Sequence, residues 1–251
     1  GIVTESFFAA RDQLLTLQGD PERARAEFRW PDVGDNFNWA HDVFDLIAED
    51  NDTTALWIAE ETGREYKRSF RELKRRSDQV ANWLRGIGAK RGDIAMLMLG
   101  NHVELWEIML AAMQLGVVIL PTSVVLGPQE LVDRVERGNV RWVFAGPEDA
   151  VKFASIPGDF RGIGVRLEEG TMDQRAALYD WARFEESRSA SVAPVAKLTA
   201  STDPALLYFT SGTTKLPKIA VHSHTSSPLG HFTTMAWLGV RPGDVHSVIS
   251  A

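Results

Sequence analysis

The sequence predicts an α/β protein in which a mostly parallel β-sheet is flanked by helices on both faces. Two patterns support this fold class. From residue 92 onward, short continuous apolar runs alternate with longer segments whose apolar residues recur at helical spacing. The runs lack a polar residue at every second position, so they are typical of parallel strands that are buried on both faces. A chain of 251 residues, 44% of them hydrophobic, can build such a core.

The N-terminal third predicts helices and one short hairpin ahead of the alternating part. Residues 1–35 are expected to form a helical lead-in and a polar connection. Asn38 can cap a helix that continues to Ile47 with one apolar face. Two short strands, residues 53–59 and 66–67, follow this helix, with a glycine-containing turn between them.

The next helix is expected from Phe70 to Leu84, and its start is clearly marked. Ser69 precedes it and Glu72 follows three residues later, which is the capping-box pattern. The face opposite its apolar residues is basic and extends a cluster that begins in the preceding strand. The cluster contains Arg64, Lys67, Arg68, Arg71, Lys74, Arg75 and Arg76. We interpret it as the solvated side of an amphipathic helix, with binding of phosphates or another anion as the alternative.

Strands and helices then alternate. The expected strands are residues 94–99, 117–120, 140–145 and 163–167. Asn101 is expected to cap the helix between the first two strands. Gly127 with Pro128 opens a second helix, which ends at Gly138. A third helix is expected over residues 173–186, followed by a linker-like polar stretch over residues 187–204.

Composition and charge exclude several classes of function. The net charge of −7 argues against nucleic acid as the main partner. The absence of cysteine removes disulfides, thiolate metal sites and a cysteine nucleophile. Glu107 and Pro121 interrupt the apolar stretch from Leu105 to Leu126, so a buried helix and a strand explain it better than a membrane span. Glu5 and Arg11 interrupt the apolar core that a signal peptide needs, and we expect a cytoplasmic protein.

The most informative segment is a polar loop between two apolar runs, residues 205–209 and 219–221. The loop contains Thr210, Ser211, Gly212, Thr213, Thr214, Lys215 and Lys218. Its small residues let backbone amides converge on an anion, its hydroxyls add donors, and its lysines add positive charge. The pattern therefore predicts a phosphate-binding loop between two strands, with an ordinary polar turn as the alternative. It is not the Walker loop, because the required Gly-Lys-Ser/Thr string is absent.

Two histidines follow the loop. His222 and His224 lie two residues apart and share one face if the strand continues. Together with His231 or His246 they suggest a metal site, but no carboxylate has ligand-like spacing and the chain has no cysteine. We therefore expect no metal site in this chain. The elements expected beyond the loop are a helix over residues 225–238 and a strand over residues 245–249.

The loop resembles a known signature. Residues 210–218 read Thr-Ser-Gly-Thr-Thr-Lys-Leu-Pro-Lys, and eight of these nine positions match the signature loop of the adenylate-forming superfamily. That superfamily contains acyl-CoA synthetases, luciferases and the adenylation domains of peptide synthetases. Lys215 stands where the family usually has glycine, and it adds a cation beside the phosphates. Further matching segments are Asn38-Trp39-Ala40, the helix from Phe70 to Leu84, Lys90-Arg91-Gly92-Asp93 and Tyr208-Phe209. Over most of residues 36–250 the chain is most similar to medium-chain acyl-CoA synthetases.

The resemblance implies a division of the chain. Residues 36–251 would be an incomplete N-terminal portion of an adenylate-forming large domain, preceded by the lead-in of residues 1–35. In that family a small mobile C-terminal domain carries the catalytic lysine, and further motifs supply the adenine contact, the magnesium-binding glutamate and the ribose-binding aspartate. The motifs of these groups are not found in the 251 residues. No catalytic residue is therefore assigned, and we expect the chain to be a fragment that is inactive alone.

The resemblance also implies a reaction. A carboxylic acid, medium-chain fatty or aromatic, would attack ATP to form an acyl-adenylate and release pyrophosphate, and coenzyme A would then displace AMP. Mg2+ would accompany ATP, with its ligand expected downstream of this chain. The alternatives are a non-catalytic relative that binds a nucleotide or a partner protein, and an adenylating enzyme whose acceptor is a carrier protein or oxygen.

The residues implied for this reaction lie in and after the loop. The phosphate contacts would come from Thr210, Ser211, Gly212, Thr213, Thr214, Lys215 and Lys218. These groups would hold and screen the leaving pyrophosphate, because catalysis of such transfers depends on positioning and on stabilising charge. His222 and His224 would lie near the nucleotide or the acyl pocket.

Overall fold

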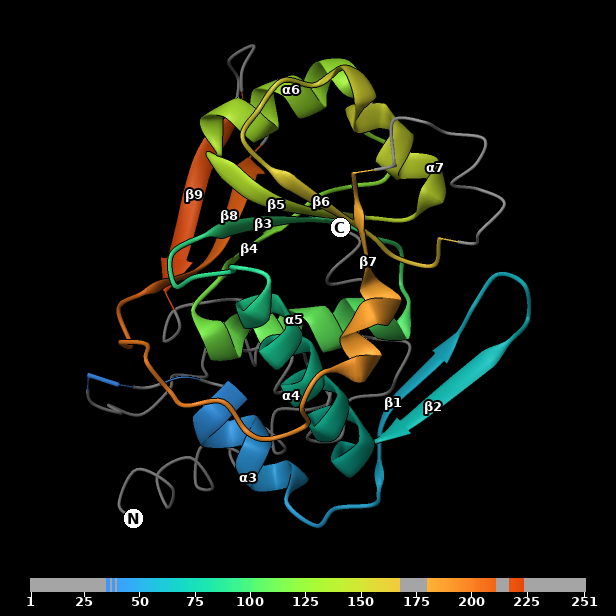
Figure 1. Ribbon diagram of the computed structural model, residues 1–251, viewed down its shortest axis with the longest axis vertical. Coiled ribbons are helices and arrows are strands. Elements are labelled where there is room, and N and C mark those ends of the chain that lie inside the picture. The colour runs from blue at the N-terminus through green and yellow to red at the C-terminus, as the bar shows by residue number, and fades with distance from the viewer. Residues whose placement is uncertain (1–34, 37, 39, 168–179, 211–216, 224–251) are drawn as a thin grey trace, which may run out of the picture.

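The structure, a computed structural model, describes residues 35, 36, 38, 40–167, 180–210 and 217–223. Within these residues a two-stranded sheet and a seven-stranded sheet form, and helices lie on both faces of the larger sheet (Figure 1). The strands are β1 (Thr54–Ala59), β2 (Glu65–Ser69), β3 (Ile94–Met98), β4 (Val118–Pro121), β5 (Val140–Ala145), β6 (Arg161–Gly164), β7 (Ala182–Arg183), β8 (Pro204–Thr210) and β9 (Lys218–Ser223). The helices are the π-helix η1 (Ala40–Phe44), α3 (Asp45–Ala48), α4 (Phe70–Gly86), α5 (Val103–Leu115), α6 (Pro128–Arg137), α7 (Pro147–Ala150) and the 3-10 helices η2 (Val151–Ser155) and η4 (Phe184–Ser189).

The larger sheet is mostly parallel, as the alternation predicts. Its strand order, over the described part of the chain, is β7-β6-β5-β3-β4-β8-β9. All neighbours pair in parallel except β8 and β9, which form an antiparallel hairpin. The chain passes from β3 to β4 on one side and then crosses to β5 on the other side of β3. The carboxyl ends of the parallel strands therefore share one edge, and β8 ends at that edge where the predicted loop begins.

The two faces of the sheet hold two separate cores. In β3, Ala95 and Leu97 pack with residues of α4 and α5, whereas Met96 and Met98 pack with residues of α6 and α7. This division follows from the alternation of side chains along a strand. Figure 1 shows the two helix pairs on opposite sides of the sheet. A strand with both faces covered has to be apolar at every position, which explains the continuous apolar runs in the sequence.

The start of α4 confirms the capping box. The Ser69 hydroxyl accepts a hydrogen bond from the Glu72 amide at 3.0 Å, and the Glu72 carboxylate accepts one from the Ser69 amide at 3.0 Å. Each bond satisfies an amide that the helix itself leaves without a partner. The local pattern was sufficient for this prediction because both partners lie within four residues of each other.

Arg76 contradicts the interpretation of the basic cluster as a solvated face, and Lys74 departs from it because its side chain is only 23% exposed. Arg76 is 9% exposed, because α5 and η4 pack against this side of α4. Its Nε lies 3.4 Å from the carboxylate of Glu107, its Nη2 donates to the Ser187 hydroxyl at 2.7 Å, and its guanidinium stacks on the ring of Phe184. Burial raises the pKa of Glu107 to about 7 although Arg76 opposes the shift. Arg64, Lys67, Arg71 and Arg75 are exposed, as the interpretation requires.

Two further expectations were wrong in detail. The N-cap of α5 is His102, not Asn101, and the His102 side chain makes no capping bond because it turns toward Glu60 instead. The helix expected over residues 173–186 does not extend over residues 180–186, where β7 and η4 lie. Ala182 and Arg183 of β7 pair in parallel with β6, a long-range contact that overrides local helix propensity. Residues 173–179 of that expected helix lie outside the described residues.

The polar stretch of residues 190–203 contains no regular element but is firmly attached to the domain. The Asn82 side chain donates to the carbonyls of Ser191 and Ala193 at 3.0 and 2.7 Å. Val195 and Thr199 are 7% and 4% exposed. The stretch is therefore a packed connection and not a loose linker.

The apolar stretch from Leu105 to Leu126 divides into α5 and β4, as expected. No helix in the described ranges is long and apolar enough to cross a bilayer. The lead-in of residues 1–34 and the elements expected at 225–238 and 245–249 lie outside the described residues.

Candidate functional site

The predicted phosphate-binding loop connects β8 to β9. Thr210 is the last residue of β8, Lys218 is the first residue of β9, and the two are paired across the hairpin. The structure therefore brings together the two ends of the predicted loop at the carboxyl edge of the sheet, where α/β proteins bind their ligands. Ser211, Gly212, Thr213, Thr214 and Lys215 lie outside the described residues.

The two candidate histidines are only partly covered by the structure. His222 lies in β9, where its backbone pairs with Leu206 of β8, and His224 lies outside the described residues. Among the residues that the structure does describe, no three histidine, aspartate or glutamate side chains converge in a group that could hold a metal ion.

β8 is positioned by packing on both of its faces. It pairs in parallel with β4 through Ile119 and Leu206. Leu206 packs into the core beneath α4 and α5, and Leu207 packs into the core beneath α6. Tyr208 and Phe209 continue this alternation as partly buried residues, one on each face. The last residues before the loop are thus held between two layers of helices.

Three polar contacts fasten the segment that leads into β8. The amide of Ser201 donates to the carbonyl of Asp35 at 2.7 Å. Arg91 forms two hydrogen bonds with the carboxylate of Asp203, at 2.6 and 2.7 Å. The side chain of Asn38 donates to the hydroxyl of Thr199 at 2.9 Å. These contacts fix the position at which the chain enters the sheet.

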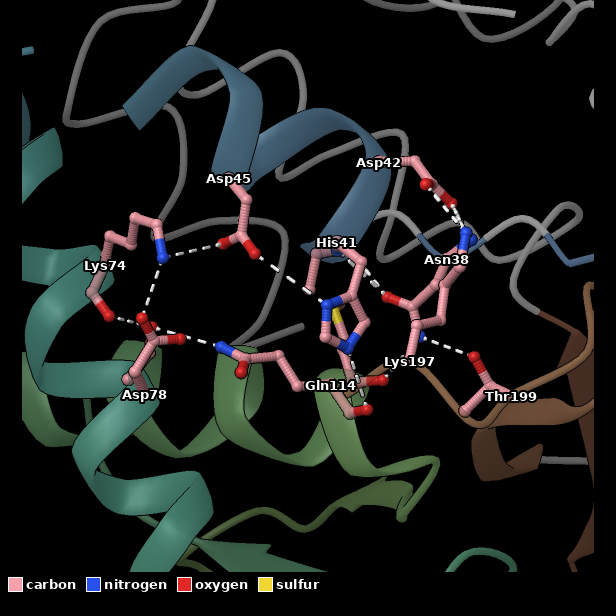
Figure 2. Close-up of polar contacts among 12 residues, drawn as sticks. Asn38, His41, Asp42, Asp45, Lys74, Asp78, Gln114, Lys197 and Thr199 are labelled. Carbon is pink, nitrogen blue, oxygen red and sulfur yellow. Dashed lines mark hydrogen bonds and ion pairs between the residues drawn. The ribbon is translucent and has the colours of Figure 1, made fainter. Parts of the chain in front are cut away.

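Asn38 is the centre of a buried polar network that Figure 2 shows. Its side chain is fully buried and donates a second hydrogen bond to the carbonyl of Met113 at 2.7 Å. Its oxygen accepts from the amides of Ala40 and His41 at 3.0 and 3.3 Å, which confirms the expected cap. The network therefore joins the first helical turn, the end of α5 and the segment before β8.

The same network continues to α4 through charged groups. His41 lies between the carbonyl of Gln114, 3.1 Å from Nε2, and the carboxylate of Asp45, 3.8 Å from Nδ1. Burial lowers the pKa of His41, although the bond to Gln114 opposes the shift. Lys74 pairs with Asp78 at 2.7 Å and approaches Asp45 at 3.9 Å (Figure 2). Burial raises the pKa of Asp45 to about 7, in spite of Lys74.

The C-terminal end of α6 holds the stem of the hairpin. Arg137 donates from Nη2 to the carbonyl of Pro217 at 2.6 Å. The guanidinium groups of Arg134 and Arg137 lie 4.8 and 5.3 Å from the ring centre of Phe209. Asp133 accepts a hydrogen bond from each arginine at 3.1 Å. Sequence reasoning missed these residues because 80 positions separate Arg137 from Pro217.

A second ionic cluster lies at the carboxyl ends of β3 and β6. Arg166 pairs with Glu60 at 2.9 Å and with Glu104 at 2.6 Å, and His102 lies 2.7 Å from Glu60. Burial alone would raise the pKa of Glu60, but the hydrogen bonds from Arg166 and His102 outweigh it and lower the pKa. The cluster attaches the β1–β2 hairpin to the sheet. In the sequence these residues are only separate polar side chains in three segments, around residues 60, 102–104 and 166.

Comparison with known proteins shows the family to which the chain belongs. Residues 44–249 match the model of the AMP-binding enzyme family. The chain is 32% identical over 218 residues to 4-hydroxybutyrate–CoA ligase 1 of Metallosphaera sedula, an alignment that covers 86% of this chain and 37% of the relative. It is 28% identical over 246 residues to the human mitochondrial acyl-coenzyme A synthetase ACSM2B, covering 95% of this chain and 40% of the relative. The chain thus spans about two fifths of the length of these curated relatives.

Solved structures show the same fold. The acetoacetyl-CoA synthetase of Streptomyces lividans superimposes with a TM-score of 0.68 at 20% identity, over 82% of this chain and 33% of that protein. A benzoate CoA ligase from Burkholderia xenovorans LB400 superimposes with a TM-score of 0.59 at 25% identity, over 75% of this chain and 35% of that protein. The family match covers the sheet, both helical layers and the predicted phosphate-binding loop. The relatives named above are a CoA ligase and an acyl-coenzyme A synthetase. This chain belongs to the AMP-binding enzyme family.

Proposed function

We propose that this chain is the phosphate-binding part of an enzyme that uses ATP to join a carboxylic acid to coenzyme A. The observation that carries the proposal is the nine-residue signature of residues 210–218, whose two ends are paired at the carboxyl edge of the parallel sheet. Membership of the AMP-binding enzyme family supports it. The names of the relatives, which include acyl-coenzyme A synthetases and a 4-hydroxybutyrate–CoA ligase, favour coenzyme A as the acceptor.

The proposed reaction has two steps. An oxygen of the carboxylate attacks the α-phosphorus of ATP, and the bond from that phosphorus to the oxygen bridging the α- and β-phosphates breaks. Pyrophosphate leaves with this oxygen, and the acyl-adenylate is formed. The thiol of coenzyme A loses its proton to solvent, its sulfur attacks the acyl carbon, and AMP leaves with the electron pair of the broken bond. The acid is proposed to be a medium-chain fatty or aromatic acid, which would place the enzyme in fatty acid or aromatic acid metabolism.

The loop acts by position and charge. The hydroxyls of Thr210, Ser211, Thr213 and Thr214 and the backbone of Gly212 are proposed to contact the β- and γ-phosphate oxygens. Lys215 and Lys218 are proposed to screen the charge that develops on pyrophosphate as it leaves. His222 and His224 are second-line candidates for the nucleotide or acyl pocket.

Magnesium is proposed to accompany ATP, since it neutralises phosphate charge in phosphoryl-transfer enzymes generally. The described residues offer no metal-like cluster, so no residue of this chain is assigned to the ion. The chain alone is proposed not to complete adenylation, because the family's catalytic lysine and its adenine, ribose and magnesium motifs are not found in the sequence. A cytoplasmic location stays a prediction, and several relatives, among them human ACSM2B, are named mitochondrial proteins.

The proposal is tested by ATP–pyrophosphate exchange in the full-length protein, with octanoate and benzoate as acids. We expect acid-dependent exchange that Ser211→Ala lowers about a hundredfold, since removal of one donor to a developing charge has an effect of this order. The matched control is Ser155→Ala, an exposed serine at the end of η2, which should exchange at the unsubstituted rate. Nucleotide binding without exchange for any acid would indicate a non-catalytic relative. Faster transfer to a carrier phosphopantetheine arm than to coenzyme A would indicate a carrier-protein acceptor.

A further inference from the structure

We infer that Asp133, Arg134 and Arg137, here called the α6 clamp, set the geometry of the phosphate-binding loop by holding both of its ends. The inference rests on the proposed function of residues 210–218. Neither the family match nor the loop signature assigns a role to this helix. The contacts below make Arg137 a positioning residue that acts through the loop and not by touching the nucleotide.

The clamp holds the C-terminal end of the loop through a backbone hydrogen bond. Nη2 of Arg137 donates to the carbonyl of Pro217 at 2.6 Å, and Pro217 directly precedes Lys218 at the start of β9. Proline has a restricted φ angle, so fixing its carbonyl also fixes the direction in which the chain enters β9. Hydrogen bonds from a charged donor are stronger than those between neutral groups.

The clamp holds the N-terminal end of the loop through an aromatic ring. Phe209 directly precedes Thr210, and both guanidinium groups lie within cation–π distance of its ring, at 4.8 Å for Arg134 and 5.3 Å for Arg137. Arg137 therefore contacts the residue before Thr210 and the residue before Lys218 at the same time. A single side chain that contacts both ends restrains the distance between them.

The clamp itself is rigidly built. One carboxylate oxygen of Asp133 accepts a hydrogen bond from Arg134 and another from Arg137, each at 3.1 Å, which orients both guanidinium groups. The helix beneath them is anchored by Leu131 and Val135, which are 0% and 3% exposed. The arginine side chains are only 15% and 30% exposed, so water competes weakly for their partners.

Stabilisation of the helix end does not account for this arrangement. Basic side chains in the last turn interact favourably with the helix dipole wherever they point. That effect needs neither the contact with Phe209 nor the bond to Pro217. Arg141, on β5, serves as the comparison for an arginine that contacts neither end of the loop, because it pairs with the 98% exposed carboxylate of Asp159 on the surface.

The consequence concerns the terminal phosphates of the nucleotide. Ends that are already held at a fixed spacing leave less conformational entropy to be lost when residues 210–218 bind the β- and γ-phosphates. AMP has neither group, so the clamp should affect ATP affinity and leave AMP affinity nearly unchanged. A lysine at position 137 keeps the charge but lacks the planar fork that contacts three partners together.

The test is calorimetric titration of the full-length protein with Mg-ATP and with AMP, for the unsubstituted protein and for R137M, R137K and R141M. We expect R137M to lower the ratio of ATP affinity to AMP affinity about tenfold, equivalent to about 1.4 kcal/mol. R137K, which keeps the positive charge and a similar side-chain length, should lower the same ratio by a smaller factor of about three. R141M should keep the ratio of the unsubstituted protein within twofold.

The outcomes distinguish this inference from the function on which it rests. If the unsubstituted protein prefers ATP but R137M and R137K keep that ratio within twofold, the clamp has no positioning role and the inference is wrong. An equal loss of ATP and AMP affinity in R137M would show a structural role only and would also overturn it. If the unsubstituted protein shows no preference for ATP over AMP, the inference is wrong, whereas the proposed function fails only if acid-dependent ATP–pyrophosphate exchange is also absent.

Discussion

Replacement of Asn38 by alanine tests the buried network that fixes the segment before β8. The substitution removes four hydrogen bonds of a fully buried side chain, to Met113, Thr199, Ala40 and His41. Loss of the cap over the first helical turn costs about 1 kcal/mol. Loss of the buried bonds to Met113 and Thr199 costs about 1 kcal/mol each. We therefore expect N38A to lower the free energy of unfolding by about 3 kcal/mol.

The measurement is urea denaturation followed by tryptophan fluorescence, in which a lower midpoint with an unchanged slope reports a loss of stability. Asn82→Ala is the matched control, since it also removes two side-chain hydrogen bonds to backbone carbonyls, but at exposed positions. Its expected cost is about 0.5 kcal/mol, because water replaces the lost partner. Equal losses in N38A and N82A, within about 0.5 kcal/mol, would show that burial of the network adds nothing.

Three further predictions follow from the described residues. Burial raises the pKa of Asp45 to about 7, so the stability that its protonated form contributes is fully present below about pH 4 and is lost as the pH rises through 7. In urea melts, the free energy of unfolding of D45N relative to that of the unsubstituted protein should therefore rise by about 2 kcal/mol between pH 5 and pH 8. Gly116 has a φ of +74° and an added Cβ would lie 2.8 Å from Thr199, so G116A should lower the free energy of unfolding in the same urea melts by about 2–3 kcal/mol. The control G86A, which has open space at its Cβ, should leave this free energy unchanged or slightly higher. Arg166→Gln removes the cation between Glu60 and Glu104, so trypsin should cleave this variant after Arg64 and Lys67 faster than it cleaves the control Arg141→Gln. Cleavage is followed by mass spectrometry, and equal rates in the two variants would contradict the attachment of the β1–β2 hairpin by this cluster.

Local patterns were sufficient for most elements of the fold. The capping box at Ser69 and Glu72 involves neighbours in the sequence, and the structure confirms it. The apolar run that becomes β3 is buried on both faces, so its composition alone indicates a central strand. The predicted loop lies between two strands as expected, because its small and hydroxyl-bearing residues separate two apolar runs.

Features that depend on distant partners were not predictable in this way. Arg76 is indistinguishable from its basic neighbours in the sequence, and only the packing of Glu107 and Phe184 against α4 makes it a buried residue. β7 exists because β6 lies beside it, so a helical pattern over the same residues was misleading. The position of β5 next to β3 likewise depends on where the chain crosses the sheet after β4, and the sequence of neither strand indicates it. The contact of Arg137 with Pro217 requires the whole sheet to be assembled.

A structure of the full-length protein with a non-hydrolysable ATP analogue tests the central claim most directly. The account predicts that the β- and γ-phosphates lie within hydrogen-bonding distance of the hydroxyls and amides of residues 210–218, beyond the paired ends Thr210 and Lys218. A triphosphate bound at another place, with this loop making no contact to it, would contradict the assignment of the loop and the function built on it.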